Sequence, residues 1–175
     1  ILITVVAGIA LNKYSKHGSI IRSMPNTACA FGTGITGLYA DDQKSHGFKN
    51  AIKLFSRTGH VLALENEGEM HRFTSIIGSG QAFLVQVLKV YLLDLEKISS
   101  NEWNNLNDVF NHFVSSLGDS FAEEPDFENL INRIKSPGGT TQAGLESLEN
   151  SELDKIFREA FKAAKNRSIE ISNEQ

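Results

Sequence analysis

Residues 136–141 read Ser-Pro-Gly-Gly-Thr-Thr, and this segment limits what the chain can fold into more than any other. Pro137 lacks an N–H group and fixes φ, so no helix runs through it. Gly138 and Gly139 carry no Cβ, so the backbone can take positive φ and a ligand can come close. Apolar residues at helical spacing precede and follow the segment, over residues 126–134 and 141–149. We therefore expect two amphipathic helices joined by a sharp turn.

This turn has two interpretations. The threonines open the second helix, where unpaired N–H groups and the positive end of the dipole favour an anion. With the neighbouring hydroxyl groups, such a turn is a receptor for a small carboxylate or phosphate. The alternative is a tight interhelical turn in which Thr141 is the N-cap. Spacing alone leaves both interpretations open.

The first 65 residues have the pattern of an α/β fold. We expect strands over residues 1–6, 19–24, 36–39 and 60–64, and a helix capped by Asp41 or Asp42 that ends at Arg57. That helix should turn four side chains toward the sheet: Phe48, Ile52, Leu54 and Phe55. Residues 1–65 are thus predicted to be the C-terminal part of a doubly wound, Rossmann-like domain. Residues 1–6 indicate a buried parallel strand with no partner before it, so we expect sequence upstream of Ile1.

Residues 66–175 are predicted to be wholly helical, which gives an α/β part followed by an all-α part. One face of the first helix carries Met70, Phe73 and Ile77. The helix from Gln81 to about Leu95 is apolar nearly all round, and such a helix must be covered on every side. We therefore expect an interlocked homodimer. Residues 169–175 are expected to fray.

Composition excludes several classes of function. Hydrophobic residues make up 41% and charged residues 22% of the chain, and the net charge is −4, so no nucleic-acid surface is expected. The longest apolar runs, residues 1–11 and 82–93, are too short to span a bilayer, so we expect no membrane partner. A single cysteine, Cys29, and the lack of a secretion signal favour the cytoplasm. Glu67 and His71 are expected to be a solvated pair, and no metal site is predicted.

Gly32, Gly34 and Gly37 match the spacing of a dinucleotide fingerprint, but we reject that interpretation. The fingerprint needs a helix directly after the third glycine and an acidic residue about 20 positions later. Here Leu38-Tyr39-Ala40 follow Gly37, and Arg57 stands at the later position. We expect a glycine-rich turn into a strand, with the true pyrophosphate loop upstream of Ile1.

Three ordered segments resemble pyrroline-5-carboxylate reductase, the last enzyme of proline synthesis. The first is the Ser136–Thr141 segment with the Ala-Gly-Leu-Glu-Ser-Leu-Glu run over residues 143–149. The second combines residues 6–9, 24–27 and 36–40, which are similar to the second half of the family's nucleotide domain. The third is Gly78-Ser79-Gly80, followed by Ala82-Phe83, where close helix packing and a ligand-facing helix start both remain open. The resemblance covers nearly the whole chain.

The resemblance implies hydride transfer from NADPH or NADH to 1-pyrroline-5-carboxylate, giving L-proline. It implies that Thr141 is catalytic, by a hydrogen bond to the ring nitrogen, and that the substrate is held by Ser136, Gly138, Gly139, Thr140 and Thr141. It assigns the nicotinamide half of the cofactor to Ala7, Gly8, Met24, Pro25 and Asn26. Residues 66–175 would be the helical dimerisation and substrate-binding domain. The chain by itself is expected to be inactive, because the pyrophosphate loop is not in it.

The chain departs from the family at several positions. Gln81 replaces a proline, His71 an acidic residue and Thr33 a glutamate. The alternative function is therefore a divergent, non-catalytic homologue that acts as a helical dimerisation module. The choice between NADH and NADPH and the assembly beyond a dimer cannot be predicted from these residues.

Overall fold

The computed structural model describes residues 1–14, 18–98 and 105–174. The chain divides into two compact units, residues 1–84 with 158–175, and residues 85–157. The predicted boundary between residues 65 and 66 falls where the sheet gives way to helices, between β4 and α2. The assignment of two domains at that boundary stays a prediction.

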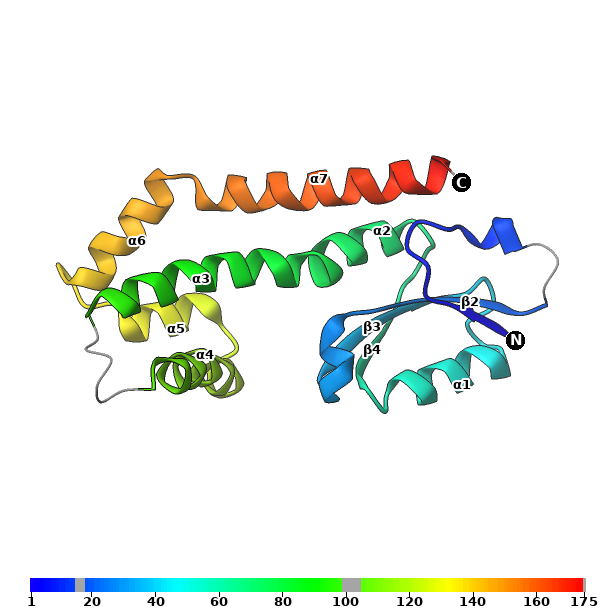
Figure 1. The fold of residues 1–175 in the computed structure, drawn as a ribbon, viewed down its shortest axis with the longest axis horizontal. Helices are drawn as coiled ribbons and strands as arrows, with labels where there is room; N and C mark the ends of the chain where they lie inside the picture. Colours follow the sequence, from blue (N-terminus) through cyan, green and yellow to red (C-terminus); the bar gives the residue numbers. More distant parts are fainter. Residues whose placement is uncertain (15–17, 99–104, 175) are drawn as a thin grey trace. The chain divides into compact units, whose positions relative to one another are not determined.

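The first unit contains a mixed four-stranded sheet (Figure 1). Its strands lie side by side in chain order: β1 (Leu2–Thr4), β2 (Ile20–Pro25), β3 (Gly34–Tyr39) and β4 (Gly59–Ala63). β1 and β2 are parallel, as are β3 and β4, but β2 and β3 are antiparallel. The short 3₁₀ turn η2 (Thr27–Phe31) joins β2 to β3 and is too short for the crossover that parallel strands need. This explains why part of the sheet departs from doubly wound order.

β1 lies at an edge of the sheet and pairs only with β2 among the described residues. The predicted parallel direction is confirmed, but the predicted burial is not. Ile1, Val5 and Val6 are 73%, 57% and 50% exposed, because no described element covers that edge. Leu2 and Ile3 are half-buried.

Helix α1 (His46–Phe55) covers one face of the sheet (Figure 1). Ser45 caps it by accepting a hydrogen bond from the Phe48 N–H, so the prediction of an Asp41 or Asp42 cap is wrong. Asp42 supports the cap instead, since its carbonyl accepts from the Ser45 hydroxyl at 2.7 Å. Leu54 was expected to face the sheet but is 52% exposed. Successive side chains of a helix lie 100° apart around its axis, so Leu54 lies outside the apolar stripe that carries Phe48.

On the other face of the sheet, α2 (Glu69–Phe73) packs on β3, and the π-helical turn η3 (Thr74–Gly78) packs on β2. Met70 and Phe73 are buried with Leu64, and Ile77 packs against them, which confirms the predicted apolar face. A Cβ on Gly37 would lie 2.9 Å from the Phe73 ring, so Gly37 lets this helix approach the sheet.

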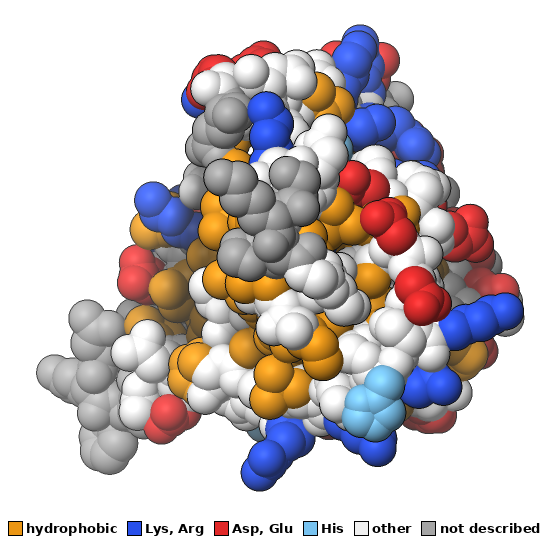
Figure 2. Space-filling model, turned by 90° about the vertical axis from the view of Figure 1, so that its right-hand side faces the viewer, with side chains coloured by type: hydrophobic (Ala, Val, Ile, Leu, Met, Phe, Trp, Pro, Cys, Tyr) orange, Lys and Arg blue, Asp and Glu red, His pale blue; other side chains and the backbone are white. Residues whose placement is uncertain are grey.

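Five longer helices follow: α3 (Gly80–Ile98), α4 (Leu106–Glu123), α5 (Phe127–Ile134), α6 (Thr140–Asn150) and α7 (Leu153–Glu174). The helices before and after the Pro-Gly-Gly turn agree with the predicted limits within one residue. Inside the second unit, the rings of Tyr91 and Phe113 lie 5.8 Å apart, and those of Phe121 and Phe127 lie 5.2 Å apart. Hydrophobic side chains also reach the surface of the chain in adjoining groups (Figure 2).

Residues 69–98 form a helical stretch of 30 residues that is long and apolar enough to cross a membrane, judged by length and composition alone. Its most apolar window has a mean hydropathy of 1.5 and is 6% buried. The prediction that the longest apolar segments are the runs 1–11 and 82–93, each too short to span a bilayer, is therefore wrong. It counted uninterrupted apolar runs, whereas the helical stretch continues through Gly78–Gly80 and Lys89.

The C-terminal turns of α7 are ordered against the first unit. Ser168 is buried, and its hydroxyl lies 2.9 Å from the His71 Nδ1 atom. Ile171 lies against Gly8. The prediction that residues 169–175 fray is wrong for residues 169–174, because these contacts hold the end of the helix.

Candidate functional site

The Ser136–Thr141 segment forms a turn that requires glycine at Gly138 and is crowded at Gly139. Gly138 has a φ of 69°, in the left-handed region. A Cβ on Gly139 would lie 2.2 Å from the Ser136 Oγ atom. Gly139 is the N-cap of α6, so the prediction that Thr141 is the cap is wrong.

The N-terminus of α6 keeps donors that no described side chain satisfies. The Gly139 N–H donates to the Ser136 carbonyl at 3.0 Å, and the Gly138 N–H donates to Gln142 Oε1 at 3.0 Å. No side-chain bond caps the helix, and no described side chain accepts from the N–H groups of Thr140 and Thr141. Ser136 and Thr140 are exposed and Thr141 is half-buried. The turn is thus open to an anionic group.

The residues predicted to hold the cofactor gather at one edge of the sheet. Ala7 and Gly8 follow β1, and Asn26 follows β2 directly. Because β1 and β2 are parallel, their carboxyl ends meet at the same edge, where open α/β sheets bind ligands. The Ser23 hydroxyl donates to the Thr4 carbonyl at 2.9 Å and ties the two strand ends together.

Asn26 is fixed in orientation by β3. Its Oδ1 atom accepts from the Ile35 N–H at 2.9 Å, and its own N–H donates to the Ile35 carbonyl at 3.2 Å. The carboxamide oxygen is therefore engaged, and the NH₂ group is the part left to donate to a ligand.

Gly8 has a structural role as well. Its φ is 80°, and a Cβ there would lie 2.7 Å from the Ile171 Cγ2 atom. This side of Gly8 is covered by α7, whereas Ala7 is exposed.

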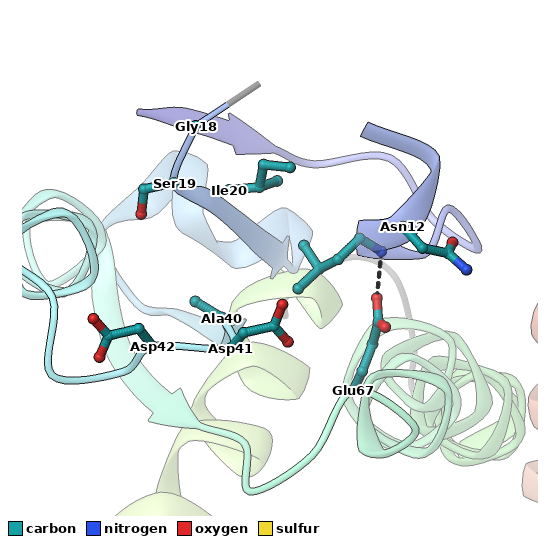
Figure 3. A pocket seen from close by; sticks show the side chains of 9 residues that line it. Asn12, Gly18, Ser19, Ile20, Ala40, Asp41, Asp42 and Glu67 are labelled. Carbon is teal, nitrogen blue, oxygen red and sulfur yellow. Dashed lines mark hydrogen bonds between the residues drawn. The ribbon is translucent and has the colours of Figure 1, made fainter. Parts of the chain in front are cut away.

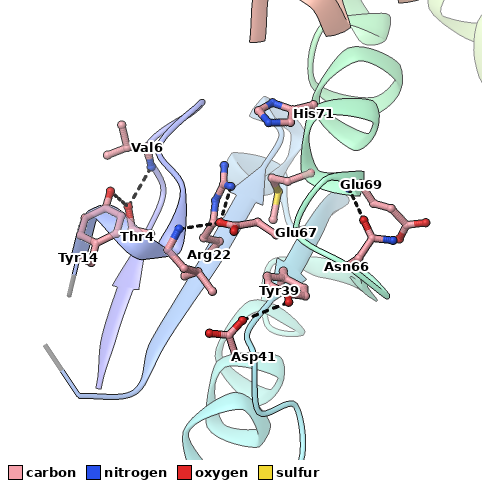
Figure 4. Close-up of polar contacts among 12 residues, drawn as sticks. Thr4, Val6, Tyr14, Arg22, Tyr39, Asp41, Asn66, Glu67, Glu69 and His71 are labelled. Atoms are coloured by element: carbon pink, nitrogen blue, oxygen red, sulfur yellow. Dashed lines mark hydrogen bonds and ion pairs between the residues drawn. The ribbon is translucent and has the colours of Figure 1, made fainter. Parts of the chain in front are cut away.

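A polar cluster that the sequence did not reveal joins β2 to two segments distant in sequence (Figure 4). Arg22 is 2% exposed, and its Nη1 atom lies 2.9 Å from Glu67 Oε1, which also accepts from the Leu11 N–H at 2.6 Å. His71 bonds Ser168 instead of Glu67, so the predicted solvated pair is wrong. Burial, and then the charge of Arg22, lower the pKa of His71. An arginine inside a predicted buried strand was the signal that a partner was needed.

A pocket of about 500 Å³ lies at the opposite edge, where β2 begins and β3 ends (Figure 3). Asp41, Asp42 and Glu67 are among its lining residues, and none of the predicted site residues is. Within the described residues, no group of three or more His, Cys, Asp and Glu side chains could hold a metal ion.

The literal Gly32, Gly34 and Gly37 pattern does not form a pyrophosphate loop. Gly32, at a φ of 74°, ends η2, Gly34 begins β3 and Gly37 lies within β3. A turn into a strand was the prediction, and it is confirmed. The Ser136–Thr141 turn lies in the Val85–Phe157 unit, and Ala7, Gly8 and Asn26 lie in the other unit.

Comparisons with known proteins agree on one family. The family model for pyrroline-5-carboxylate reductase dimerisation matches residues 67–171. Pyrroline-5-carboxylate reductase from Staphylococcus saprophyticus is 31% identical over 182 residues, covering 98% of this chain and 65% of the relative. The enzyme of the same name from Staphylococcus aureus strain COL is also 31% identical, and the match covers 98% of this chain and 65% of that relative.

Solved structures show the same fold. A pyrroline-5-carboxylate reductase from Coxiella burnetii is 26% identical, with a TM-score of 0.86, and 97% of this chain and 65% of that chain are covered. The Plasmodium falciparum pyrroline carboxylate reductase with NADP bound is 22% identical, also with a TM-score of 0.86, and the match covers 98% of this chain and 70% of that chain. At this identity the match shows the fold alone. The chain spans about 65% of the length of the curated relatives it matches.

Proposed function

This chain belongs to the pyrroline-5-carboxylate reductase family, and we propose on that premise that it serves the reduction of 1-pyrroline-5-carboxylate to L-proline by NADPH or NADH. The observation that carries the proposal is the open turn at the N-terminus of α6. Gly138 has a backbone conformation that strains any other residue, and the free donors of the turn suit a small carboxylate.

The substrate's carboxylate would be held by donors that the turn leaves free. These are the hydroxyl groups of Ser136 and Thr140 and the N–H groups of Thr140 and Thr141. Gly138 and Gly139 shape the turn, and their own N–H groups donate within the chain. A carboxylate with several such bonds is fixed in position and orientation, which is the main catalytic contribution that a reductase site makes.

Thr141 would accept a hydrogen bond from the protonated ring nitrogen. Its side chain lies one position inside α6 and is half-buried, so it has fewer orientations than an exposed hydroxyl. No acid–base pair is needed if the imine arrives protonated. Thr141 then holds the N–H in place while the neighbouring carbon is reduced.

The nicotinamide end of the cofactor fits the edge formed by Ala7, Gly8, Met24, Pro25 and Asn26. The NH₂ group of Asn26 is a fixed donor there, because Ile35 engages the carboxamide oxygen. When bound, a reduced nicotinamide supplies the hydride. Among the described residues, no glycine-rich turn from strand to helix is present to hold a pyrophosphate, so these residues fit only that end of the cofactor.

We propose that a second copy of the chain covers the apolar helices as an interlocked dimer. Val85 and Val90 on α3 are 59% and 56% exposed, and Val109 on α4 is 45% exposed. The family is defined by a dimerisation region, which matches residues 67–171. A protein partner, and not a lipid bilayer, would then cover the Glu69–Ile98 stretch. Its setting would be the cytoplasm.

A second function, a non-catalytic dimerisation module, is favoured by one observation. The family model that matches the chain is that of the dimerisation region alone, over residues 67–171. Both functions predict a dimer, but only the first predicts that the turn binds a carboxylate.

The test is thermal unfolding of the chain with and without L-proline. We expect L-proline to raise the melting temperature, and Thr141→Ala to weaken that effect severalfold. Thr27→Val, a hydroxyl removed far from the turn in sequence, is the control and should keep the full effect. An unchanged melting temperature at high L-proline concentration would refute a competent carboxylate site and leave the dimerisation module.

A further inference from the structure

A hydrogen bond between Thr27 and Gln81 joins the start of η2, just after β2, to the start of α3. The Thr27 hydroxyl donates to Gln81 Oε1 at 2.9 Å across 54 positions of sequence. Thr27 is the first residue of η2 and follows Asn26 directly, and Gln81 lies in the first turn of α3. Both side chains are exposed, so a ligand can reach them.

This bond decides which half of the Gln81 carboxamide remains for a ligand. Since the oxygen accepts from Thr27, the NH₂ group is left as a donor, and no described residue accepts from it. Asn26 has the same arrangement, with its oxygen engaged by the Ile35 N–H. The NH₂ groups of Asn26 and Gln81 are thus both left to donate, and such a donor suits a carbonyl oxygen.

We propose that Gln81 is a binding residue for the cofactor: its Nε2 atom donates to the carboxamide oxygen of the nicotinamide ring. Thr27 is the positioning residue that keeps the Gln81 NH₂ group turned outward. The ligand is the nicotinamide and not the substrate, because Thr27 follows Asn26 at the carboxyl end of β2, where the cofactor edge is proposed. The inference rests on the proposed reduction and adds a contact from α3.

Three substitutions separate a ligand contact from a structural one. Gln81→Met keeps the length of the side chain and removes the carboxamide. Gln81→Glu keeps an oxygen that accepts from Thr27 but removes the NH₂ donor. Thr27→Val keeps the side-chain shape and removes only the orienting hydroxyl.

The measurement is the Kd of the full 175-residue chain for reduced nicotinamide riboside, read from the fluorescence of the dihydropyridine. This probe carries the carboxamide and no phosphate, so the charge of Gln81→Glu does not repel a phosphate. We expect Gln81→Met and Gln81→Glu each to weaken binding about 3–10-fold, the range of one neutral hydrogen bond. Thr27→Val should weaken it about twofold, and Gln81→Glu should keep the wild-type melting temperature.

The outcomes are distinct. Wild-type binding of the riboside by Gln81→Glu would overturn the proposal, because the Thr27 bond would then be structural only. So would weaker stabilisation by L-proline in the Gln81 variants with unchanged riboside binding, since the ligand would be the wrong one. If the wild-type chain binds L-proline but no riboside, the Gln81 proposal fails and the carboxylate site stands. If it binds neither, the proposed function fails too.

Discussion

At the scale of single residues, the most constrained side chain is Arg22. It is almost fully buried in β2, and the Glu67 carboxylate is the described group that balances its charge. The same carboxylate oxygen holds the Leu11 N–H, so one acidic side chain joins β2 to the segment after β1. A buried cation without its partner is strongly destabilising, and Glu67 is therefore part of the fold as well as of the pocket rim.

His71 gives this cluster a pH dependence. Its pKa in the folded chain lies below the usual 6.5, chiefly because of burial and then because of Arg22. The Glu67 charge opposes the shift and that of Lys165 adds to it. The unfolded chain therefore binds more protons as the pH falls through about 6.5 toward the folded pKa, and stability is lost in that window.

We predict that the free energy of unfolding, measured in urea, decreases from pH 7.5 to pH 5.5, and that His71→Asn reduces this decrease. His60→Asn, at an exposed position of β4, is the matched control and should leave it unchanged. Equal slopes for wild type and His71→Asn would show that His71 does not carry the dependence.

At the scale of elements, the docking of α7 depends on one glycine. Gly8 has a left-handed backbone and lies against Ile171. A side-chain methyl group at this position would therefore strain the backbone and overlap the Ile171 side chain. Gly144, inside α6, has nothing within 4 Å of its added Cβ and an ordinary helical backbone.

Gly8→Ala is expected to destabilise the chain by about 2 kcal/mol through strain and overlap. Gly144→Ala should instead stabilise it by about 0.5–1 kcal/mol, because alanine favours a helix. Chemical unfolding of both variants measures the difference. A Gly8→Ala variant with the wild-type free energy of unfolding would mean that α7 does not pack against the Gly8 loop.

The sequence predicted the elements best where backbone chemistry leaves little choice. Pro137 and the two glycines after it placed the ends of α5 and α6 within one residue. The α1 cap was missed because Asp42 and Ser45 are both good capping residues. In the structure the Asp42 carbonyl accepts from the Ser45 hydroxyl, and Ser45 is the cap.

The antiparallel β2–β3 pair was missed because strand direction follows from the length of the connection, not from strand composition. The Thr27–Gln81 and Arg22–Glu67 bonds join distant segments, which no local pattern shows.

At the scale of the whole molecule, the outstanding feature is apolar surface on helices. Phe113 and Phe121 on α4 are more than 40% exposed, and Tyr91 on α3 is 53% exposed. Contiguous surface of this kind marks an interface between proteins. In the proposed dimer, the second copy completes the core that one chain leaves open.

Val90→Glu should therefore shift the chain from dimer to monomer, because it places a charge in the interface. Lys89→Glu puts the same side chain at the neighbouring polar position and should leave the dimer intact. Sedimentation velocity at several protein concentrations measures both. A wild-type chain that stays monomeric at high concentration would contradict the proposed interface.

The most direct test of the account is a titration of the ¹⁵N-labelled chain with L-proline and with L-prolinamide, followed by amide chemical shifts. We predict that L-proline shifts the amide signals of Thr140 and Thr141 most, and that L-prolinamide, which lacks the carboxylate, shifts them little. Equal shifts from both compounds, or L-proline shifts confined to other residues, would contradict a carboxylate site at the start of α6.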